Sequence, residues 1–283
     1  GIGDACDNAP PTITAIGVTR AKGSPASNSQ VATVNDEEDD ENTLTVTVNG
    51  SNDATVNGVT VSSLSVDSSG QVTADVAASC AAMDAVFTLR VTDSGGLFDE
   101  DTLHVTVVAN NTPPVVISSL SLTMLGPPFN HNLINVGLTA SATDICDGSR
   151  SVSVQVFGDE DDETVTGNDG NFSPDARDIA PGTLRLRRER IGTSDGRVYL
   201  IVIKATDASG NTGFSCLTVT APLDAQASSI NSVNAPAAAA RSFCEANNGT
   251  PPAGYNSTAS LGRTLHRTSA TKCAPFRTDG NCS

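Results

Sequence analysis

The stretch from Leu184 to Thr220, LRLRRERIGTSDGRVYLIVIKATDASGNTGFSCLTVT, decides the fold class. Leu184 and Leu186 alternate with arginines, which is the period of two of a half-buried β-strand. The segment 198–205 is apolar on both faces except at Lys204, so we expect it in the middle of a sheet in a β-sandwich. The expected strands are 184–187, 198–205 and 214–219, with turns at 192–196 and 207–211.

Asp195, Tyr199 and Ile201 have the spacing of an immunoglobulin-type tyrosine corner. In that motif a tyrosine near the start of a strand hydrogen-bonds back to the turn that precedes it. Ile201 stands where an antibody domain would carry its second cysteine. We therefore expect Asp195 and Tyr199 to have structural roles.

The composition is that of an all-β extracellular protein. The chain has 283 residues, no Trp, two Tyr and only 17% charged residues. This length accommodates two domains of about 100–150 residues. No apolar run is long enough to span a membrane as a helix, so we expect no membrane span.

The net charge of −16 is unevenly distributed. Residues 1–112 carry a net −13, residues 113–222 carry −5, and residues 223–283 carry +2. Nucleic-acid binding needs Lys and Arg to neutralise phosphates, so the acidic body disfavours it. The same charge favours divalent cations such as calcium.

Two internal echoes indicate tandem domains. The segment from Asn8, NAPPTI, is nearly repeated as NTPPVV from Asn111, and TDSGG from Thr92 is echoed by TDASG from Thr206. We predict tandem immunoglobulin-like Greek-key β-sandwiches and an irregular C-terminal tail, with boundaries at 11–112, 113–222 and 223–283. The expected strands of the first sandwich are 12–18, 30–34, 43–48, 56–66, 71–77, 85–92 and 102–108, and the second adds 115–122, 136–143 and 151–157.

The second sandwich resembles a HYR (hyalin repeat) module over 113–222. The resemblance rests on ATDICDGS from Ala142, and on ATDASGNT from Ala205 followed by Cys216. It implies an adhesive or spacer module without enzyme chemistry, and a disulfide between Cys146 and Cys216. The first sandwich would carry a counterpart between Cys6 and Cys80.

Two further resemblances suggest calcium ligands. Residues 1–10 resemble the end of a thrombospondin type-3 calcium repeat, which implies that Asp4 and Asp7 bind calcium in a fragment of a longer secreted protein. The segment 91–103 resembles the last hairpin of bacterial cadherin-like and PKD-type repeats. We expect Asp93, Asp99 and Asp101 at the end of that sandwich nearest the junction, where such residues would bind calcium and stiffen the hinge.

Two charged segments each allow two interpretations. The carboxylate runs 36–41 and 159–163 are either solvated loops that raise solubility or contributors to a hard-cation site. The arginines of 185–190 either form a solvated sheet face that pairs with 159–163 or bind an anion or a glycan.

The cysteines favour disulfides over zinc. Seven cysteines without a C-x-x-C pair, together with only three His, argue against a zinc site. Wide spacing in a β-rich chain suits an oxidising compartment. The three His are isolated, with no nucleophile or paired base near them in sequence, and the chain has no P-loop, so we predict no enzyme.

Residues 223–283 contain too few apolar residues to fold alone. Their positive charge, beside an acidic body, and their three cysteines favour ordering by contact with another copy of the chain. The alternative is a tail packed on its own sandwich and closed by a Cys244–Cys273 bridge.

We therefore predict an extracellular structural or adhesive protein that is stiffened by calcium and self-associates through its tail into a surface or matrix filament. Its other partners would be surface glycans or proteins. The alternative is a non-catalytic spacer or glycan-binding stalk of a larger secreted hydrolase.

Overall fold

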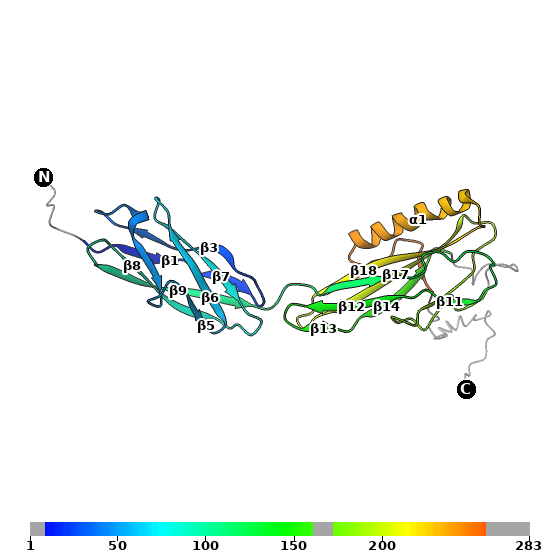
Figure 1. Cartoon of the computed structure of the whole chain (residues 1–283), viewed down its shortest axis with the longest axis horizontal. Helices are drawn as coiled ribbons and strands as arrows, with labels where there is room; N and C mark the ends of the chain where they lie inside the picture. The colour runs from blue at the N-terminus through cyan, green and yellow to red at the C-terminus, as the bar shows by residue number, and fades with distance from the viewer. Residues whose placement is uncertain (1–8, 161–171, 259–283) are drawn as a thin grey trace, which may run out of the picture.

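The computed structural model describes residues 9–160 and 172–258. Two β-sandwiches lie end to end, and a single long helix lies on the outer side of the second (Figure 1). We call them the N-terminal sandwich, made of strands β1 to β9, and the C-terminal sandwich, made of strands β10 to β19. The all-β fold predicted from the sequence is confirmed.

The N-terminal sandwich has two sheets. The first has the order β1-β3-β7-β6-β5, and the second has the order β2-β9-β8-β4, in which β2 and β9 run parallel. The elements are β1 (Thr12–Ala15), β2 (Val18–Ala21), β3 (Ser27–Asn35), η1 (Glu41–Thr43), β4 (Thr45–Val48), β5 (Ala54–Val56), β6 (Val59–Val66), β7 (Gln71–Ala78), β8 (Ala85–Thr92) and β9 (Phe98–Val108).

Alternating apolar residues build the core of this sandwich. In β8, Ala85, Phe87, Leu89 and Val91 point inward and are buried, while the residues between them are more exposed. Burying a side chain of this size contributes on the order of 2 kcal/mol. The regular alternation explains why this strand was predicted with its correct bounds.

A hairpin interrupts the strand that we predicted over 56–66. Asn57 and Gly58 both have positive φ, at 49° and 80°, and they connect β5 to β6. Asn-Gly supplies the two left-handed residues that a tight two-residue hairpin requires. The single predicted strand is therefore two antiparallel strands.

The C-terminal sandwich contains three small sheets. Their strand orders are β18-β17-β14-β19, β10-β12-β13 and β11-β16-β15. The elements are β10 (Val115–Ser119), β11 (Leu133–Asn135), β12 (Thr139–Asp144), β13 (Gly148–Arg150), β14 (Ser153–Gly158), β15 (Ala176–Arg177), β16 (Arg185–Arg187), β17 (Gly196–Thr206), β18 (Thr212–Pro222), α1 (Ala227–Ala246) and β19 (Asn256–Ser257).

Strand β17 is covered on both faces, as its sequence predicts. Tyr199 and Ile201 belong to the main core of the sandwich. Val198 and Leu200 point to the other face, where they pack with residues of α1 or beside it. The apolar character of both faces therefore has two different causes, the opposite sheet and the helix.

The predicted irregular tail is wrong for residues 223–258, which contain α1 and β19, whereas self-association through the tail stays a prediction. The buried residues of α1 are Val233, Ala237, Ala240 and Cys244, which recur every three or four positions and form one stripe of the helix. This stripe packs on β17 and β18 of the same chain (Figure 1). Beyond the helix, β19 pairs with the edge of β14. The remaining tail lies outside the described residues.

A disulfide fixes this helix to the sheet. Cys216 of β18 bonds to Cys244 of α1, with their Cα atoms 6.2 Å apart, and both residues are buried. The alternative Cys244–Cys273 bridge is therefore wrong, although the packing of the tail on its own sandwich is correct for the described part. Cys216 belongs to the cluster beneath the helix, not to the core between the sheets.

Candidate metal centre at the junction of the sandwiches

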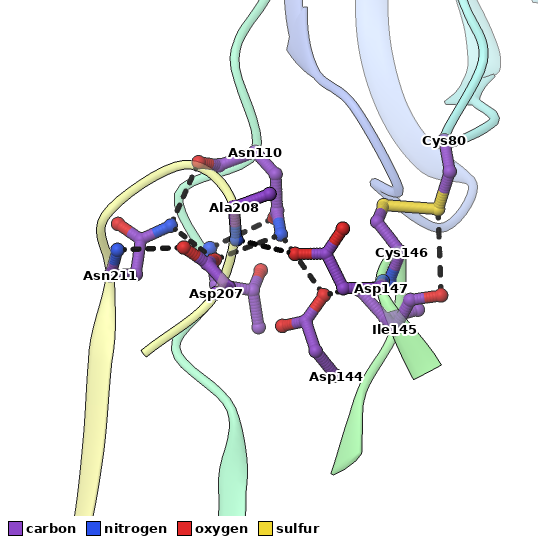
Figure 2. Close-up of a disulfide and its surroundings, with 10 residues drawn as sticks. Cys80, Asn110, Asp144, Ile145, Cys146, Asp147, Asp207, Ala208 and Asn211 are labelled. Atoms are coloured by element: carbon purple, nitrogen blue, oxygen red, sulfur yellow. Dashed lines mark hydrogen bonds between the residues drawn. A yellow bond between two sulfur atoms is a disulfide. The ribbon is translucent and has the colours of Figure 1, made fainter. Parts of the chain in front are cut away.

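A disulfide joins the two sandwiches (Figure 2). Cys80 follows β7 and Cys146 follows β12, and their Cα atoms are 5.1 Å apart. The predicted pairings Cys146–Cys216 and Cys6–Cys80 are therefore wrong. The hyalin-repeat resemblance paired cysteines within one sandwich, whereas the turn after β12 lies against the other sandwich.

Three carboxylates gather beside this disulfide. Asp144 is the last residue of β12, Asp147 follows Cys146, and Asp207 begins the turn between β17 and β18. One oxygen from each lies within 4.8 Å of the others. Asp144 and Asp207 are buried, with 7% and 4% of their surface exposed.

Local hydrogen bonds fix the positions of these carboxylates. Asp144 Oδ1 accepts from the backbone N–H groups of Cys146, at 2.8 Å, and Asp147, at 3.0 Å, which closes a tight turn. Asp147 Oδ2 accepts from the N–H of Ala208 at 2.6 Å. The second carboxylate therefore ties the turn after β12 to the turn after β17.

Two amide side chains compensate part of this negative charge. Asn110, in the linker between the sandwiches, donates from Nδ2 to Asp144 Oδ1 at 3.4 Å and to Asp207 Oδ2 at 3.3 Å. Asn211 donates to Asp207 Oδ2 at 2.7 Å and to the carbonyl of Asn110 at 2.9 Å. The linker is thus hydrogen-bonded to the cluster of carboxylates and to Asn211 (Figure 2).

The hydrogen bonds around Asp207 favour its charged form. Desolvation raises the pKa of this carboxyl, but bonds from the Asn211 side chain and from nearby backbone N–H groups outweigh it. The net effect lowers the pKa of Asp207 below its ordinary value. Asp207 is therefore ionised at neutral pH and available to a cation.

The residues present fit a divalent cation. Asp144 Oδ2 is buried and has no hydrogen-bond partner in the described part of the chain. A buried carboxylate oxygen without a partner is costly, and a bound cation would satisfy it. Calcium takes oxygen ligands at about 2.3–2.6 Å, so two oxygens on one ion lie up to about 5 Å apart. The 4.8 Å limit of this group meets that condition.

The structure places three of the residues predicted to bind calcium at the wrong end of the N-terminal sandwich. Asp99 Oδ2 accepts from the N–H of Ile13 at 3.0 Å, and Asp101 Oδ2 accepts from Ala15 at 2.8 Å, both near the start of the chain. Asp93 belongs to the turn that connects β8 to β9. Asp99 and Asp101 lie near the start of the 11-residue strand β9, whose other end leads to the junction. Asp4 and Asp7 lie outside the described residues.

The sequence contained a pattern that could have predicted the cluster of three carboxylates at the junction. Asp144 and Asp147 both lie within the segment ATDICDGS, which we interpreted only as a family resemblance. Two carboxylates three residues apart at the end of a strand can bind one ion if a third segment approaches. That segment, around Asp207, is the second half of the same resemblance. No sequence pattern pointed to Asn110 as a member of this site.

Tyr199 forms a corner that differs from the predicted one. Its hydroxyl donates to the carbonyl of Arg187 at 2.9 Å. This acceptor precedes the turn at 192–196, which was expected to accept the bond. Arg197 Nη1 donates to the same hydroxyl at 3.1 Å. Asp195 is not a partner in this bond; its carbonyl accepts from the hydroxyl of Ser232 in α1. The structural role of Tyr199 therefore lies in joining β17 to β16.

The arginines after Leu184 are not one solvated face. Arg187 is buried, with 9% of its surface exposed, and donates to the carbonyls of Pro174 and His131. Glu160 of the acidic loop instead pairs with the buried Arg197, with 3.1 Å between Oε2 and Nε. Arg185 does remain at the surface, where it pairs with Asp178. The alternation at this strand therefore predicted its two faces, but not the burial of its charges.

Comparisons with known proteins give similarities of fold only. No family model matches the chain, and no curated protein matches it. Among solved structures it is similar to extracellular cadherin domains 3–6 of protocadherin gamma B2, with 14% identity, coverage of 75% of this chain and 46% of that chain, and a TM-score of 0.30. It is also similar to mouse cadherin-23 EC22–24, with 16% identity, 76% and 66% coverage, and a TM-score of 0.31.

A third similar structure is human mucin-like protocadherin EC1–2, with 11% identity, coverage of 74% of this chain and 97% of that chain, and a TM-score of 0.29. This chain spans less than half the length of the protocadherin gamma B2 chain. At these identities and TM-scores the similarities carry no argument about function, which rests below on the residues of this chain. None of the helices in the described ranges is long and apolar enough to cross a membrane.

Proposed function

We propose that this chain is an extracellular structural or adhesive module, a spacer of fixed shape whose two sandwiches are held in line by a disulfide and a calcium ion. The observation that carries the proposal is the junction itself. Cys80–Cys146 joins the sandwiches covalently. Three carboxylates lie beside this bond, and Asn110 of the linker donates hydrogen bonds to two of them. We propose no catalytic role.

The disulfides support an extracellular location. One joins the sandwiches, and the other fixes α1 to its sheet. Disulfides with structural roles of this kind persist in oxidising compartments and are rare in the cytosol. The acidic composition suits a protein that works in the presence of millimolar calcium.

Calcium would stabilise the junction through charge. Asp144, Asp147 and Asp207 repel one another in the absence of a cation, and amide donors compensate only part of that charge. An ion held by these carboxylates would also strengthen the position of the linker, because Asn110 contacts two of them. At a free calcium concentration 100 times the Kd, binding stabilises the folded state by about 2.7 kcal/mol.

A fixed junction serves both hypotheses drawn from the sequence. A subunit of a surface filament and a stalk of a secreted hydrolase each need a spacer that holds its ends apart at a constant distance. The described tail, packed on its own sandwich, no longer supports assembly through residues 223–258.

The test uses the full chain with calcium, with magnesium and with a chelator. Thermal melting reports stability, and small-angle X-ray scattering reports the distribution of distances across the two sandwiches. Calcium should raise Tm and narrow the longest distances, and magnesium should do so less because it demands a tighter octahedral shell. Identical melting and scattering in calcium and in chelator would overturn the proposal.

A further inference from the structure

The disulfide lies inside the loop that carries the proposed cation ligands. Cys146 is two residues after Asp144 and immediately before Asp147, and its own N–H donates to Asp144 Oδ1 at 2.8 Å. Cys80, on the N-terminal sandwich, is therefore bonded to the middle of a ligand turn that belongs to the C-terminal sandwich (Figure 2).

A glycine of the N-terminal sandwich lies against this disulfide. Gly23 has a φ of +78°, and a Cβ built on it would lie 2.6 Å from Cys146 Sγ and 3.2 Å from Ile145 Cγ2. No side chain fits in that space, so the backbone of the Gly23 loop directly contacts the disulfide. Cys80 Sγ also lies 3.5 Å from the carbonyl oxygen of Ile145. The ligand turn is thus held by packing as well as by the covalent bond.

The ligands reach the group from three segments. Asp144 and Asp147 come from one turn, Asp207 from another, and Asn110 from the linker that leaves the N-terminal sandwich. The first turn and the linker are both fixed to the N-terminal sandwich, the turn through Cys146 and the linker through the chain. The geometry of the group therefore depends on how the sandwiches are joined.

We propose that the Cys80–Cys146 disulfide is a positioning element of the junction cation site, and that cation affinity depends on its being formed. This inference rests on the proposed function. A dithiol would transfer two electrons and two protons to the bond, leaving two thiols on the protein and a cyclic disulfide on the reductant. The turn at 144–147 would then be released from the N-terminal sandwich, and the cation would have to order it on binding.

Linkage requires the reverse effect. If formation of the bond strengthens cation binding, the cation must favour the bonded form by the same factor. Coupled sites commonly differ by about 5- to 150-fold in affinity, and we expect about tenfold here. The cation would then raise by about tenfold the ratio of reduced to oxidised dithiol needed to open half of the bonds.

The first experiment measures calcium affinity by isothermal titration calorimetry on the oxidised full chain and on two double variants. Cys80→Ser with Cys146→Ser should weaken binding about tenfold. Cys216→Ser with Cys244→Ser removes the other disulfide, which fixes α1 to its sheet and belongs to the cluster beneath the helix, and should leave the affinity unchanged. Equal affinity in all three proteins would overturn the inference.

The second experiment needs no variant and so does not depend on their folding. The native chain is equilibrated with dithiothreitol at graded ratios, with calcium or with chelator, and alkylated peptides around each cysteine are quantified by mass spectrometry. Cys80 and Cys146 are half-buried, whereas Cys216 and Cys244 are buried, so the junction bond should open first. A midpoint that calcium does not move would overturn the inference.

The two proposals fail in different ways. If the oxidised chain binds no calcium, the proposed function is wrong and the disulfide has no site to position. If the oxidised chain binds calcium with an affinity that the reduced chain retains, the proposed function stands and only the role of the disulfide is wrong.

Discussion

The two sandwiches contain the same acidic turn, but in the described residues only the turn of the C-terminal sandwich belongs to a group of three carboxylates that could hold a cation. In the N-terminal sandwich, Asp36 Oδ1 accepts from the N–H groups of Glu38 and Asp39, each at 2.8 Å. At the junction, Asp144 Oδ1 accepts from the residues two and three positions later, at 2.8 and 3.0 Å. Both turns also leave the second oxygen of the first carboxylate buried without a partner among the described residues.

The match extends to the second turn of each sandwich. Asp39 accepts from the N–H of Ser94, just as Asp147 accepts from Ala208, and these donors follow Asp93 and Asp207. The two turns differ in the groups from other segments that contact them. Within residues 9–160 and 172–258, a linker amide, Asn110, and an intersandwich disulfide meet the turn at the junction only. Among these residues the shared turn alone does not gather a candidate cation site, and at the junction the linker and the neighbouring sandwich contribute to one.

The largest expected effect separates the two turns directly. Asp144→Asn should abolish the calcium response, a loss of about 2.7 kcal/mol at a calcium concentration 100 times the Kd. In chelator the same variant should be more stable than the parent, because one of three mutually repelling carboxylates is neutralised. Chemical denaturation with and without calcium measures both effects.

Asp36→Asn is the matched control, since it alters the same position of the same turn in the other sandwich. It should leave most of the calcium response intact. If the two variants lose the response equally, the difference that we draw between the turns is wrong.

The next effect tests the packing of the N-terminal sandwich against the disulfide. Gly23→Ala should destabilise the chain by about 2 kcal/mol more than Gly50→Ala and should reduce the fraction of molecules with the Cys80–Cys146 bond. Both glycines have a positive φ, at 78° and 75°, so the backbone strain is matched. Nothing lies within 4 Å of a Cβ at Gly50, whereas a Cβ at Gly23 meets the disulfide.

Denaturation curves and peptide mapping of the disulfide measure these two effects. Equal losses of stability in the two variants, with the junction bond fully formed in both, would show that the close approach at Gly23 has no energetic consequence.

A smaller effect concerns the linker. Asn110→Asp should destabilise the chain by about 1 kcal/mol in chelator, because it replaces the donor to Asp144 and Asp207 by a like charge. With calcium bound, the added carboxylate becomes a ligand and the loss should shrink or reverse. The measurement is the difference in Tm between calcium and chelator, which should grow relative to the parent. A constant difference would place Asn110 outside the cation site.

The sequence predicted most of the strands because their side chains alternate or, in β17, are apolar throughout. It did not predict that a helix, α1, covers the second face of β17. The four consecutive alanines at 237–240 are strong helix formers, but we interpreted the tail by its low apolar content, which underestimates a helix that buries only one narrow stripe.

The disulfide pairing could not be obtained from the sequence alone. The partner of Cys146 depends on which loop of the neighbouring sandwich the turn after β12 meets, and that is a property of the junction. The same reason explains the candidate site. The acidic residues were visible, but their grouping required the relative positions of two turns and a linker from different parts of the chain.

The smallest expected effect is an electrostatic penalty that lies away from the junction and should not respond to calcium. Burial raises the pKa of Asp159 to about 6, even though the N–H of Val198 donates to its carboxylate at 2.8 Å. A carboxyl whose pKa is higher in the folded chain than in the unfolded chain makes folding less favourable as it ionises. Stability should therefore fall as pH rises from about 4 to about 6, and Asp159→Asn should remove that fall.

The variant keeps a side-chain oxygen that can accept from the N–H of Val198. Its gain should be absent below about pH 4, grow as pH rises to about 6, and be complete above that pH. The gain should be modest, because the carboxyl keeps partial contact with solvent, which screens the penalty. Thermal melting from pH 4 to pH 7.5, with Asp53→Asn as an exposed control, measures it. Calcium should not change the gain, in contrast to Asp144→Asn. A gain that follows calcium instead of pH would show that the far end of the sandwich and the junction are coupled, and the contrast between the two regions would no longer hold.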